Sequence, residues 1–406
     1  MTFWTKRAIL ISLSYGRLIG AVKIIHKLCA AVKRFSFTVQ NTLTEGGGLE
    51  MAQPLVLVGD IGGTKTSLAL FSLAERGSRE HFVPLCPAVY PSKRYDSLEP
   101  MIQEYLSWVR ERLVGDPNIV AATFGVAGPV TGRVCRTTNL PWIVDAGSLE
   151  KLISVQEGNV NLLNDLEALA WSVGGDPLIP LATIQEGEPG TSTTMVLVAP
   201  GTGLGEAVLC GRDENFFALP SEGGHADWAP VNKEQARLLE YLWEEFSHVS
   251  VERVLSGMGI VRLYTFLAKD IPAPNRPLPI PKAEPPADFP SQISQKALDE
   301  KDPVCMKALE MFAEILAQEA SNMVLKVLAR GGCFIGGGIP IRIRPFLESV
   351  AFRRRFVEKG RYSELLAKVP VWIILDPEAP LVGSAFYASR HVLSYSIGER
   401  LHDNRN

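Results

Sequence analysis

The sequence has few cysteines, and none of them form a recognisable pair. They are Cys29, Cys86, Cys135, Cys210, Cys305 and Cys333. Because they lie far apart and form no C-x-x-C motif, they argue against zinc clusters, redox dithiols and a disulfide-stabilised scaffold. We therefore expect a protein of a reducing compartment, and the cytoplasm fits best.

The chain also lacks an excess of charge of one sign and a long hydrophobic run. It carries 41 lysines and arginines against 44 aspartates and glutamates, so the totals favour neither a nucleic acid nor an acidic membrane as a partner. The apolar runs near the N-terminus are interrupted by Arg17 and Lys23 too soon to span a bilayer. The chain has 406 residues, 46% of them hydrophobic, and this length predicts a globular protein of about two to three domains.

Residues 1–50 differ in composition from the rest, because they hold seven basic residues and no acidic residue before Glu45. Three interpretations compete: a transit peptide, a peripheral membrane helix, or upstream codons translated ahead of a true start at Met51. We favour the last, because the candidate catalytic part begins directly after Met51.

The stretch "LVLVGDIGGTKTSLALF" (55–71) places apolar runs on both sides of a glycine-rich knot. It lacks the spacing of a P-loop, and the segment that follows is strand-like rather than helical. It therefore predicts a hairpin whose turn runs from Asp60 to Thr64. Glycines there allow backbone N–H groups to approach an anion, and Asp60 can hold a hydrated cation. An ordinary glycine-rich β-turn is an equal alternative.

A second stretch, "MVLVAPGTGLGEAVLC" (195–210), repeats this pattern with Gly201, Gly203 and Gly205. Its G-x-G-x-G spacing, with no helix after it, disfavours a Rossmann dinucleotide site. Two such units predict two similar α/β lobes facing each other, each giving a turn to one shared phosphate chain, with a cleft between them. Further on, "CFIGGGIP" (333–340) predicts a buried strand that ends where backbone can lie flat against a ligand.

Polar residues mark one strand-to-helix junction. In "NVNLLNDLEALAWSV" (159–173), Asn164 and Glu167 fit a capping box. Ligands of open α/β sheets also bind beyond the strand ends, where the Asp165 carboxylate could accept a proton from a substrate hydroxyl. The junction alone leaves capping and catalysis equally weighted.

Two further segments carry ambiguous polar groups. In "LPSEGGHADWAP" (219–230), Glu222 and His225 suit a ligand with adjacent hydroxyls, such as a sugar, and a metal is disfavoured because the intervening glycines break any helix. Glu252 falls in the first turn of an expected helix that Ser250 would cap, so it could simply complement the helix dipole.

Three more segments complete the pattern. "TTNLPW" (137–142) offers Asn139 as a hydrogen-bonding group or is a plain loop capped by a buried tryptophan. The proline-rich residues 271–290 predict a semi-rigid surface loop between helices. A final helix from about Leu381 is expected to tie the C-terminus back, with Gly383 allowing close packing.

Taken together, nine segments resemble the bacterial glucokinase family of the actin-like ATPase and sugar-kinase superfamily, in order and in spacing. They are "GDIGGTKTSLALF", "FGVAGPVTG", "TTNLPW", "LLNDLEALAW", "APGTGLGEA", "LPSEGGHADWAP", "SVERVLSGMGIVRLY", "FIGGGI" and "DPEAPLVGSA". The resemblance covers essentially all of residues 54–390. It implies two actin-like (ribonuclease H-like) α/β domains around a central cleft: a small domain over 51–170 to which a C-terminal helix 383–400 returns, and a large domain over 171–382.

The resemblance also implies an activity: the ATP-dependent phosphorylation of D-glucose at its 6-hydroxyl, the first step of glycolysis. Asp165 would be the general base, and Asp60 would position Mg²⁺ through water. The implied sugar-binding residues are Asn139, Asn164, Glu222, His225 and Glu252. The implied nucleotide-binding residues are Gly62, Gly63, Thr64, Gly201, Thr202 and Gly203 around the phosphates, with Gly337 and Gly338 against the adenosine. The expected partners are glucose and ATP, and a homodimer is compatible with the resemblance.

One position departs from the pattern, since many family members carry Asn where this chain has Lys65. The sister ROK kinases often carry Lys there, but they also have a cysteine-rich zinc motif after their "GH" histidine, and no cysteine falls between Cys210 and Cys305. A ROK-like or broader hexose kinase is therefore the weaker alternative. A catalytically silent sugar-binding regulator is a third, although no DNA-reading domain is evident.

Overall fold

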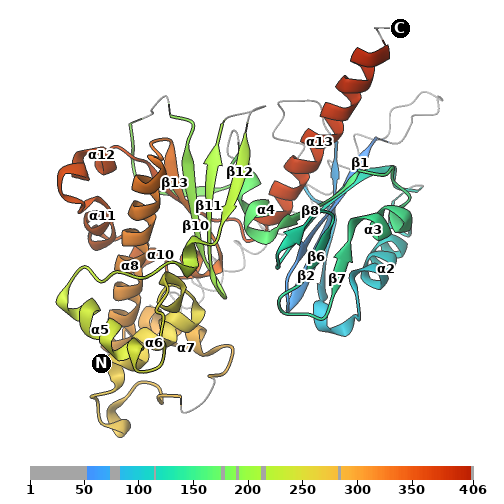
Figure 1. Ribbon diagram of the computed structural model, residues 1–406. Coiled ribbons are helices and arrows are strands. Elements are labelled where there is room, and N and C mark those ends of the chain that lie inside the picture. The colour runs from blue at the N-terminus through green and yellow to red at the C-terminus, as the bar shows by residue number, and fades with distance from the viewer. Residues whose placement is uncertain are drawn as a thin grey trace, which may run out of the picture. The chain divides into compact units, whose positions relative to one another are not determined.

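The computed structural model describes residues 53–73, 83–113, 116–174, 179–188, 192–211, 216–281 and 285–403, with side chains up to residue 391 (Figure 1). From Gln53 onward the chain forms one compact unit. The interpretation of residues 1–50 falls outside the described residues. Within the described ranges no helix combines the length and apolarity needed to cross a bilayer.

The first sheet has five strands in the order β3-β2-β1-β4-β8. Their bounds are β1 Leu55–Ile61, β2 Lys65–Ser72, β3 Leu85–Pro91, β4 Ile119–Val126 and β8 Val160–Asn164. β1 and β2 form an antiparallel hairpin, and β1, β4 and β8 run parallel. The central strands are nearly continuous apolar runs, as expected for strands buried on both faces.

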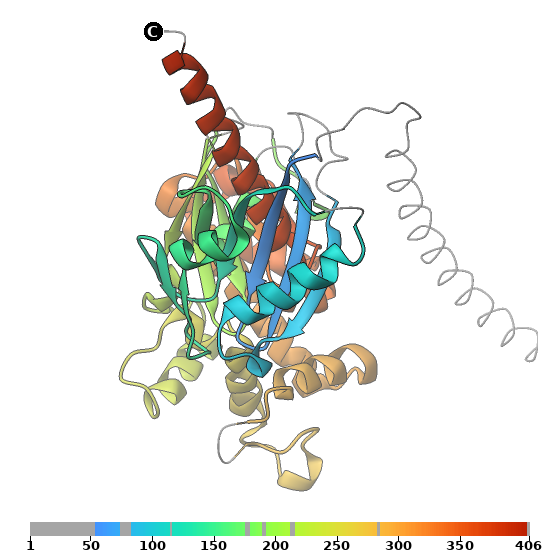
Figure 2. The ribbon, with the colours of Figure 1, turned by 90° about the vertical axis from the view of Figure 1, so that its right-hand side faces the viewer.

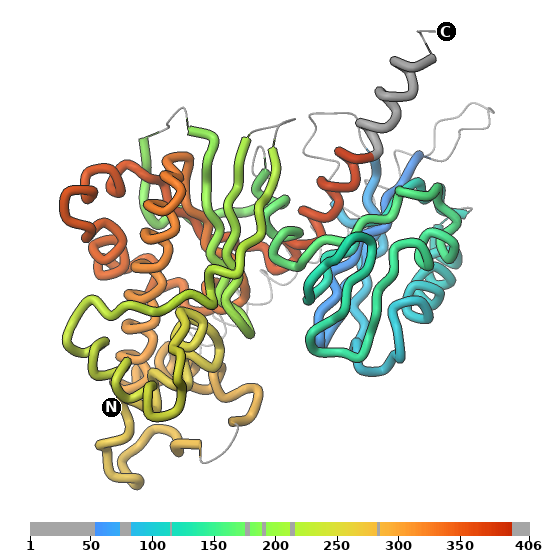
Figure 3. The backbone as a smooth tube through the Cα atoms, viewed as in Figure 1, coloured from blue at the N-terminus to red at the C-terminus, as the bar shows by residue number. Residues whose placement is uncertain are grey.

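The second sheet has six strands in the order β12-β11-β10-β13-β14-β9. Their bounds are β9 Leu181–Gln185, β10 Met195–Pro200, β11 Leu204–Cys210, β12 Phe217–Ser221, β13 Gly332–Ile335 and β14 Val371–Ile374. β10 and β11 form an antiparallel hairpin, and β10, β13 and β14 run parallel. Figure 3 follows the chain through both sheets.

Both sheets therefore share one plan: a hairpin whose first strand pairs on its other side with parallel strands. The expectation of two similar α/β units is confirmed. A small third sheet consists of β5 Val130–Thr131, β6 Val134–Arg136 and β7 Ile143–Asp145.

Helices cover the sheets. The longer ones are α2 Leu98–Arg110, α3 Ala146–Ile153, α4 Asp165–Trp171, α5 Lys233–Trp243, α6 Gly257–Ala268, α7 Phe289–Gln295, α8 Pro303–Val327, α11 Val350–Val357 and α13 Ala379–Asp403. The short ones are α9 Gly338–Arg342, α10 Arg344–Leu347 and α12 Ser363–Ala367. The buried face of α8 packs with the apolar residues of β10 and β13 in the largest core cluster.

Helix α13 begins two residues before the expected Leu381 and packs on β1 and β4 of the first sheet (Figure 2). It also packs against α4, where a Cβ on Gly383 would collide with the Ala168 carbonyl. The expectation that Gly383 allows close packing is therefore confirmed. The contact fixes α4, whose first residue is Asp165, against both α13 and the first sheet.

The proline-rich segment lies between α6 and α7, as expected, but it is more than a surface loop. Leu278 is buried in the main core, and its backbone exchanges hydrogen bonds with the hydroxyl of Tyr264. The Arg276 guanidinium donates to the carbonyls of Ala268 and Ile271. The segment is therefore the expected semi-rigid loop between helices, which the buried Leu278 side chain anchors in the core.

Candidate active site

The first glycine turn joins β1 to β2. Ile61 pairs with Thr66, and the Gly62 amide donates to the Lys65 carbonyl at 3.0 Å, so the turn is 62–64. The sequence placed Asp60 in the turn, which is wrong, because it lies in β1 opposite Ser67. The hairpin itself is confirmed.

Asn139 lies beside this first turn. A Cβ on Gly63 would stand 2.6 Å from the Cβ of Asn139, so only glycine allows the two backbones this close. The rest of "TTNLPW" is the loop expected around a buried tryptophan, since Trp142 is buried and its indole nitrogen donates to the Tyr95 carbonyl. Asn139 is therefore the residue of this loop that meets the turn.

The second glycine turn joins β10 to β11. Pro200 pairs with Leu204, and the Gly201 amide donates to the Gly203 carbonyl at 2.8 Å, which confirms the second hairpin. Thr202 is exposed at its tip. The turn is free of charged residues in its own sequence.

The third glycine run lies against the second turn. β13 is fully buried, as expected, and Gly337 follows with φ of +92°, a conformation that favours glycine. A Cβ there would stand 2.8 Å from the Pro200 carbonyl. Gly338 begins α9 with open space beside it. The chain thus brings two glycine segments together that are more than a hundred residues apart.

The junction between β8 and α4 is a capping box. The Asn164 side chain accepts from the Leu166 amide at 2.9 Å and donates to the Gly128 carbonyl at 3.3 Å. The Glu167 carboxylate accepts from the Asn164 amide. Because Asn164 and Glu167 supply the cap, the Asp165 carboxylate is left exposed at the start of the helix, with a bond to the Leu166 amide as its hydrogen bond.

Asp165 is accessible to solvent and yet partly desolvated. Burial raises its pKa, and hydrogen bonds from the backbone oppose this. Partial desolvation therefore gives this carboxylate a higher proton affinity than an aspartate in open water. The next residue, Leu166, packs against the Gly205 Cα of β11, so Asp165 stands where the first sheet meets the second.

Asp60 shares the electrostatic environment of Asp165. Burial raises the pKa of Asp60 to about 6, the nearby charges of Asp165 and Glu378 add to this, and Lys65 opposes it. The Lys65 ammonium stands 3.9 Å from a Glu378 carboxylate oxygen at the start of α13. Sequence reasoning missed Glu378, because nothing local in "DPEAP" points to a lysine more than three hundred residues earlier.

This donor set fits a magnesium ion. The charge of Asp165 adds to the raised pKa of Asp60, and a divalent cation near Asp60 would relieve that repulsion. Mg²⁺ takes oxygen ligands and is usually held by one or two carboxylates together with water and phosphate. Among the described residues no group of three or more His, Cys, Asp or Glu side chains is arranged to hold a metal alone.

Glu222 and His225 flank one 3₁₀ turn, Gly223–His225, so the expectation that the glycines break any helix holds only for an α-helix. Their side chains are 92% and 61% exposed, with the imidazole Nε2 3.9 Å from a Glu222 oxygen. Both groups are therefore free to meet a ligand. Beneath them, a Cβ on Gly224 would collide with the Leu204 carbonyl, so the loop rests on the end of the second turn.

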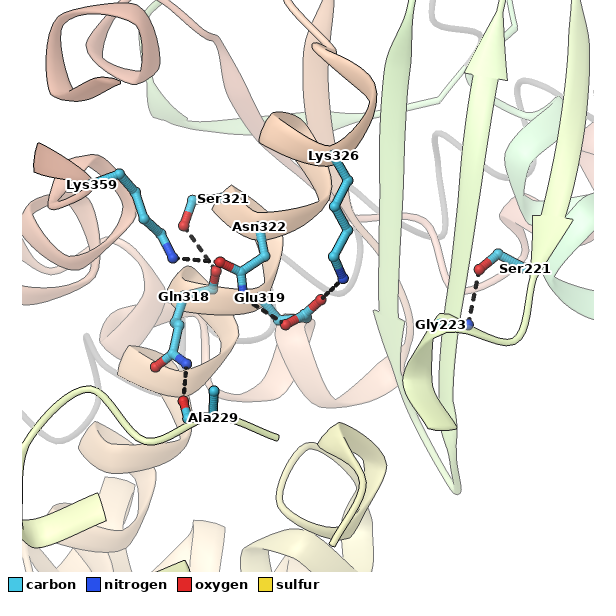
Figure 4. Close-up of polar contacts among 9 residues, drawn as sticks. All are labelled: Ser221, Gly223, Ala229, Gln318, Glu319, Ser321, Asn322, Lys326 and Lys359. Carbon is cyan, nitrogen blue, oxygen red and sulfur yellow. Dashed lines mark hydrogen bonds and ion pairs between the residues drawn. The ribbon is translucent and has the colours of Figure 1, made fainter. Parts of the chain in front are cut away.

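Helix α8 holds the far end of this loop (Figure 4). The Gln318 side chain donates to the Ala229 carbonyl at 2.6 Å, while the Gly223 amide donates to the Ser221 hydroxyl at 2.8 Å at the near end. Ser221 and Gln318 thus fasten the loop at its two ends, and the sequence pattern indicated neither of them.

Glu206 is a buried carboxylate behind this loop that sequence reasoning also missed. Its side chain is 0% exposed, and its oxygens have no hydrogen-bond partner among the described residues. Burial raises its pKa to about 7, with a further rise from Glu319 and an opposing effect of Lys326. Glu319 itself accepts bonds from Lys326 and Asn322 (Figure 4).

Glu252 lies on a 3₁₀ turn, Val251–Arg253, and α6 begins only at Gly257 with Ser256 as its cap. Ser250 is thus the N-cap residue and Glu252 lies in the first turn, as expected, but of a short 3₁₀ helix, and the Ser250 side chain makes no capping bond. The Glu252 carboxylate instead accepts from the Leu204 amide at 2.9 Å. It thus stands at the second glycine turn.

The predicted residues fall into two groups. Asp60, Asn139, Asn164 and Asp165 gather around the first turn and α4. Glu222, His225, Glu252 and the glycines of 336–338 gather around the second turn. The Leu166 side chain of α4 packs against Gly205 of β11, and this contact connects the two groups.

Comparison with known proteins decides the family. A family model described as Glucokinase matches residues 57–391. The chain belongs to the glucokinase family. The glucokinase of Nostoc punctiforme is 34% identical over 83% of this chain and 99% of its own length. The ROK alternative is therefore not supported.

Solved structures agree with this family. A glucokinase from an Antarctic psychrotroph is 32% identical, with a TM-score of 0.68 over 82% of this chain and 98% of its own. The glucokinase of Balamuthia mandrillaris, solved in complex with glucose, is 21% identical with a TM-score of 0.66 over 83% of this chain and 94% of its own, and it shares the fold.

Proposed function

We propose that this protein transfers the γ-phosphoryl group of ATP to the 6-hydroxyl of D-glucose, giving glucose 6-phosphate and ADP. One observation carries the assignment of the residues. Asp165 is left exposed by the capping box, within electrostatic range of Asp60 and at the point where the two hairpin-bearing sheets meet. Membership of the glucokinase family names the reaction.

The sugar is assigned to residues that offer hydrogen-bonding groups to hydroxyls. These are Asn139, Asn164, Glu222, His225 and Glu252. Carboxylates accept from hydroxyls, whereas amides and imidazole donate or accept. The exposure of Glu222 and His225 leaves their polar atoms open to such a ligand.

Asp165 is the general base. As the glucose 6-oxygen bonds to the γ-phosphorus, the hydroxyl proton passes to an Asp165 oxygen and the bond from the γ-phosphorus to ADP breaks. In a loose transition state the proton leaves late, so a strong base is not required. The raised pKa of Asp165 still makes it a better acceptor than a fully hydrated aspartate.

The phosphates are assigned to the turns at Gly62–Thr64 and Gly201–Gly203, where glycine lets backbone N–H groups approach oxygen atoms closely. The segment at Gly337 and Gly338 is assigned to the adenosine. Bound Mg²⁺ would neutralise part of the phosphate charge. Asp60 would hold that ion through water, and ionised Asp60 is the form that can do so.

The remaining assignments follow from the same family. We infer a cytoplasmic enzyme, a small domain over 51–170 completed by 383–400, a large domain over 171–382, and a homodimer as the assembly to be checked. Size-exclusion chromatography with light scattering tests the last point, and a monomeric mass contradicts it.

The direct test is a coupled assay of ADP release from ATP with glucose. Turnover with glucose and none without it supports the proposal. Binding of glucose without turnover would indicate a silent sugar-binding regulator. A panel of glucose, mannose, fructose and N-acetylglucosamine, compared by kcat/KM, separates a glucokinase from a broader hexose kinase.

A further inference from the structure

The second glycine turn is fastened to the segment that carries Glu252 at two places. The Leu204 amide donates to a Glu252 carboxylate oxygen at 2.9 Å. The Gly257 amide donates to the Gly201 carbonyl at 2.9 Å. Residues 252–257 therefore hold both ends of the turn.

The same segment is fastened to the sugar-assigned loop. Asp227 and Ser250 form a β-bridge, and the Val251 amide donates to the Ala226 carbonyl at 3.0 Å. The Asp227 carboxylate stands 3.0 Å from His248, which adds an ion pair when the imidazole is protonated. One short segment thus lies between the loop of Glu222 and His225 and the second turn.

We propose that the second turn is a positioning element of the sugar site, because Gly203 and the Leu204 amide fix the carboxylate of Glu252 for the sugar. This rests on the proposed function, in which Glu252 binds the sugar and the turn binds phosphate. It follows that sugar and nucleotide affinities are coupled through this contact, and that the coupling is reciprocal.

The chemistry of a carboxylate allows both duties at once. Ionised Glu252 has two oxygens with about four acceptor positions, and the Leu204 amide uses one of them. A hydrogen bond to a charged acceptor is stronger and more directional than a neutral one. A shift of the turn on phosphate binding therefore moves the Leu204 amide and re-aims the carboxylate.

Glycine is needed at position 203 for this contact. A Cβ there would stand 2.5 Å from the Glu252 carboxylate oxygen, closer than real Cβ contacts allow. A Cβ at position 201, in the same turn, meets nothing within 4 Å. Gly203→Ala and Gly201→Ala are thus a matched pair. Gly203→Ala displaces the Glu252 carboxylate, whereas Gly201→Ala leaves it in place.

The test is glucose affinity in the absence of nucleotide, measured by calorimetry on the full chain. Both variants lie in the phosphate turn and are expected to weaken ATP binding. Gly203→Ala should weaken glucose binding by about tenfold or more, since a charged hydrogen-bond acceptor is displaced, and Gly201→Ala by less than about twofold. Equal glucose affinity in the two variants overturns the proposal.

A second measurement uses the wild-type protein, so its result does not depend on whether a variant folds. Glucose affinity should change by about fivefold or more when a non-hydrolysable ATP analogue is present, and the analogue's affinity by the same factor when glucose is present. Independent binding, with a factor of one, also overturns the proposal. Normal glucose-dependent turnover with either negative result leaves the proposed function standing, whereas absent turnover counts against that function alone.

Discussion

The two glycine turns have the same backbone plan and different surroundings. Each closes an antiparallel hairpin whose first strand pairs with a parallel strand. Around the first turn stand Asp60, Lys65 and, from distant segments, Asp165 and Glu378. The second turn is held by uncharged backbone and by one carboxylate, that of Glu252.

The difference indicates a division of labour. A backbone turn can meet phosphate in either sheet, but a proton acceptor and a bound cation both need carboxylates. Asp60 and Asp165 supply two of them around the first turn, whereas the carboxylate at the second turn, that of Glu252, is bonded to the Leu204 amide. We therefore expect substitutions near the first turn to change the chemical step and those near the second to change binding.

The largest effect is expected from Asp165→Ala. Loss of the base should lower kcat by about a hundred- to ten-thousand-fold, the range typical of general-base catalysis, while glucose affinity stays within a few-fold. Steady-state ADP release and calorimetry measure the two quantities. Glu167→Gln, which touches the cap and not the base, is the matched control. Near-normal turnover in Asp165→Ala would refute the base assignment.

Asp60→Asn should have the next largest effect. It keeps the shape of the side chain but removes the charge that is assigned to Mg²⁺, so the Mg²⁺ concentration for half-maximal rate should rise by about tenfold or more. Rates measured over a Mg²⁺ titration give this value. A titration identical to that of the wild type would show that the first turn holds no cation through Asp60.

The pH dependence sharpens the same point. Because the pKa of Asp60 is about 6, protonation below that pH removes the form that holds the cation, and kcat/KM for ATP should rise through pH 6 and level off above about pH 7. Asp60→Asn should lose this limb of the profile. Should the variant keep the same limb, another group titrates in its place.

The second sheet contains a buried carboxylate, that of Glu206 in β11. Its burial predicts an effect of pH on stability that is smaller than the effects on activity above. The pKa of Glu206 is raised from 4.5 to about 7, so between these pH values the native protein keeps a proton that the unfolded chain loses. The titration of Glu206 therefore does not reduce the free energy of unfolding at low pH. It lowers that free energy as pH rises through this window, by up to about 3 kcal/mol.

Glu206→Gln removes that titration. The difference in Tm between the variant and the wild type should shift in favour of the variant from pH 5 to pH 8, as thermal unfolding followed by circular dichroism would reveal. Glu186→Gln changes an exposed glutamate directly after β9, at the other edge of the sheet from β11, and this control should show no such trend. A constant difference for Glu206→Gln contradicts the account.

Much of the fold could be predicted from local pattern. The apolar runs around 62–64 and 201–203 specify hairpins, because glycine permits the turn and both flanks are strand-like. Asn164 with Glu167 specifies a helix start, because their side chains satisfy backbone N–H groups at the beginning of the helix. These features depend on neighbours within a few residues.

The remainder depends on packing between distant segments. Local sequence left Glu252 ambiguous, because its partner is the Leu204 amide, 48 positions earlier in the chain. Lys65 meets Glu378 only because α13 returns to the first sheet. Glu206 is buried beneath Gly223 and near Glu319 and Lys326 of α8, segments that the sequence around Glu206 does not indicate.

The central claim is that both turns bind the phosphates of one nucleotide. Hydrogen exchange followed by mass spectrometry, on the wild-type protein with glucose and a non-hydrolysable ATP analogue, tests this most directly. The account predicts that peptides spanning Gly62–Thr64 and Gly201–Gly203 become protected together. Protection of one turn alone, or of neither, would contradict it.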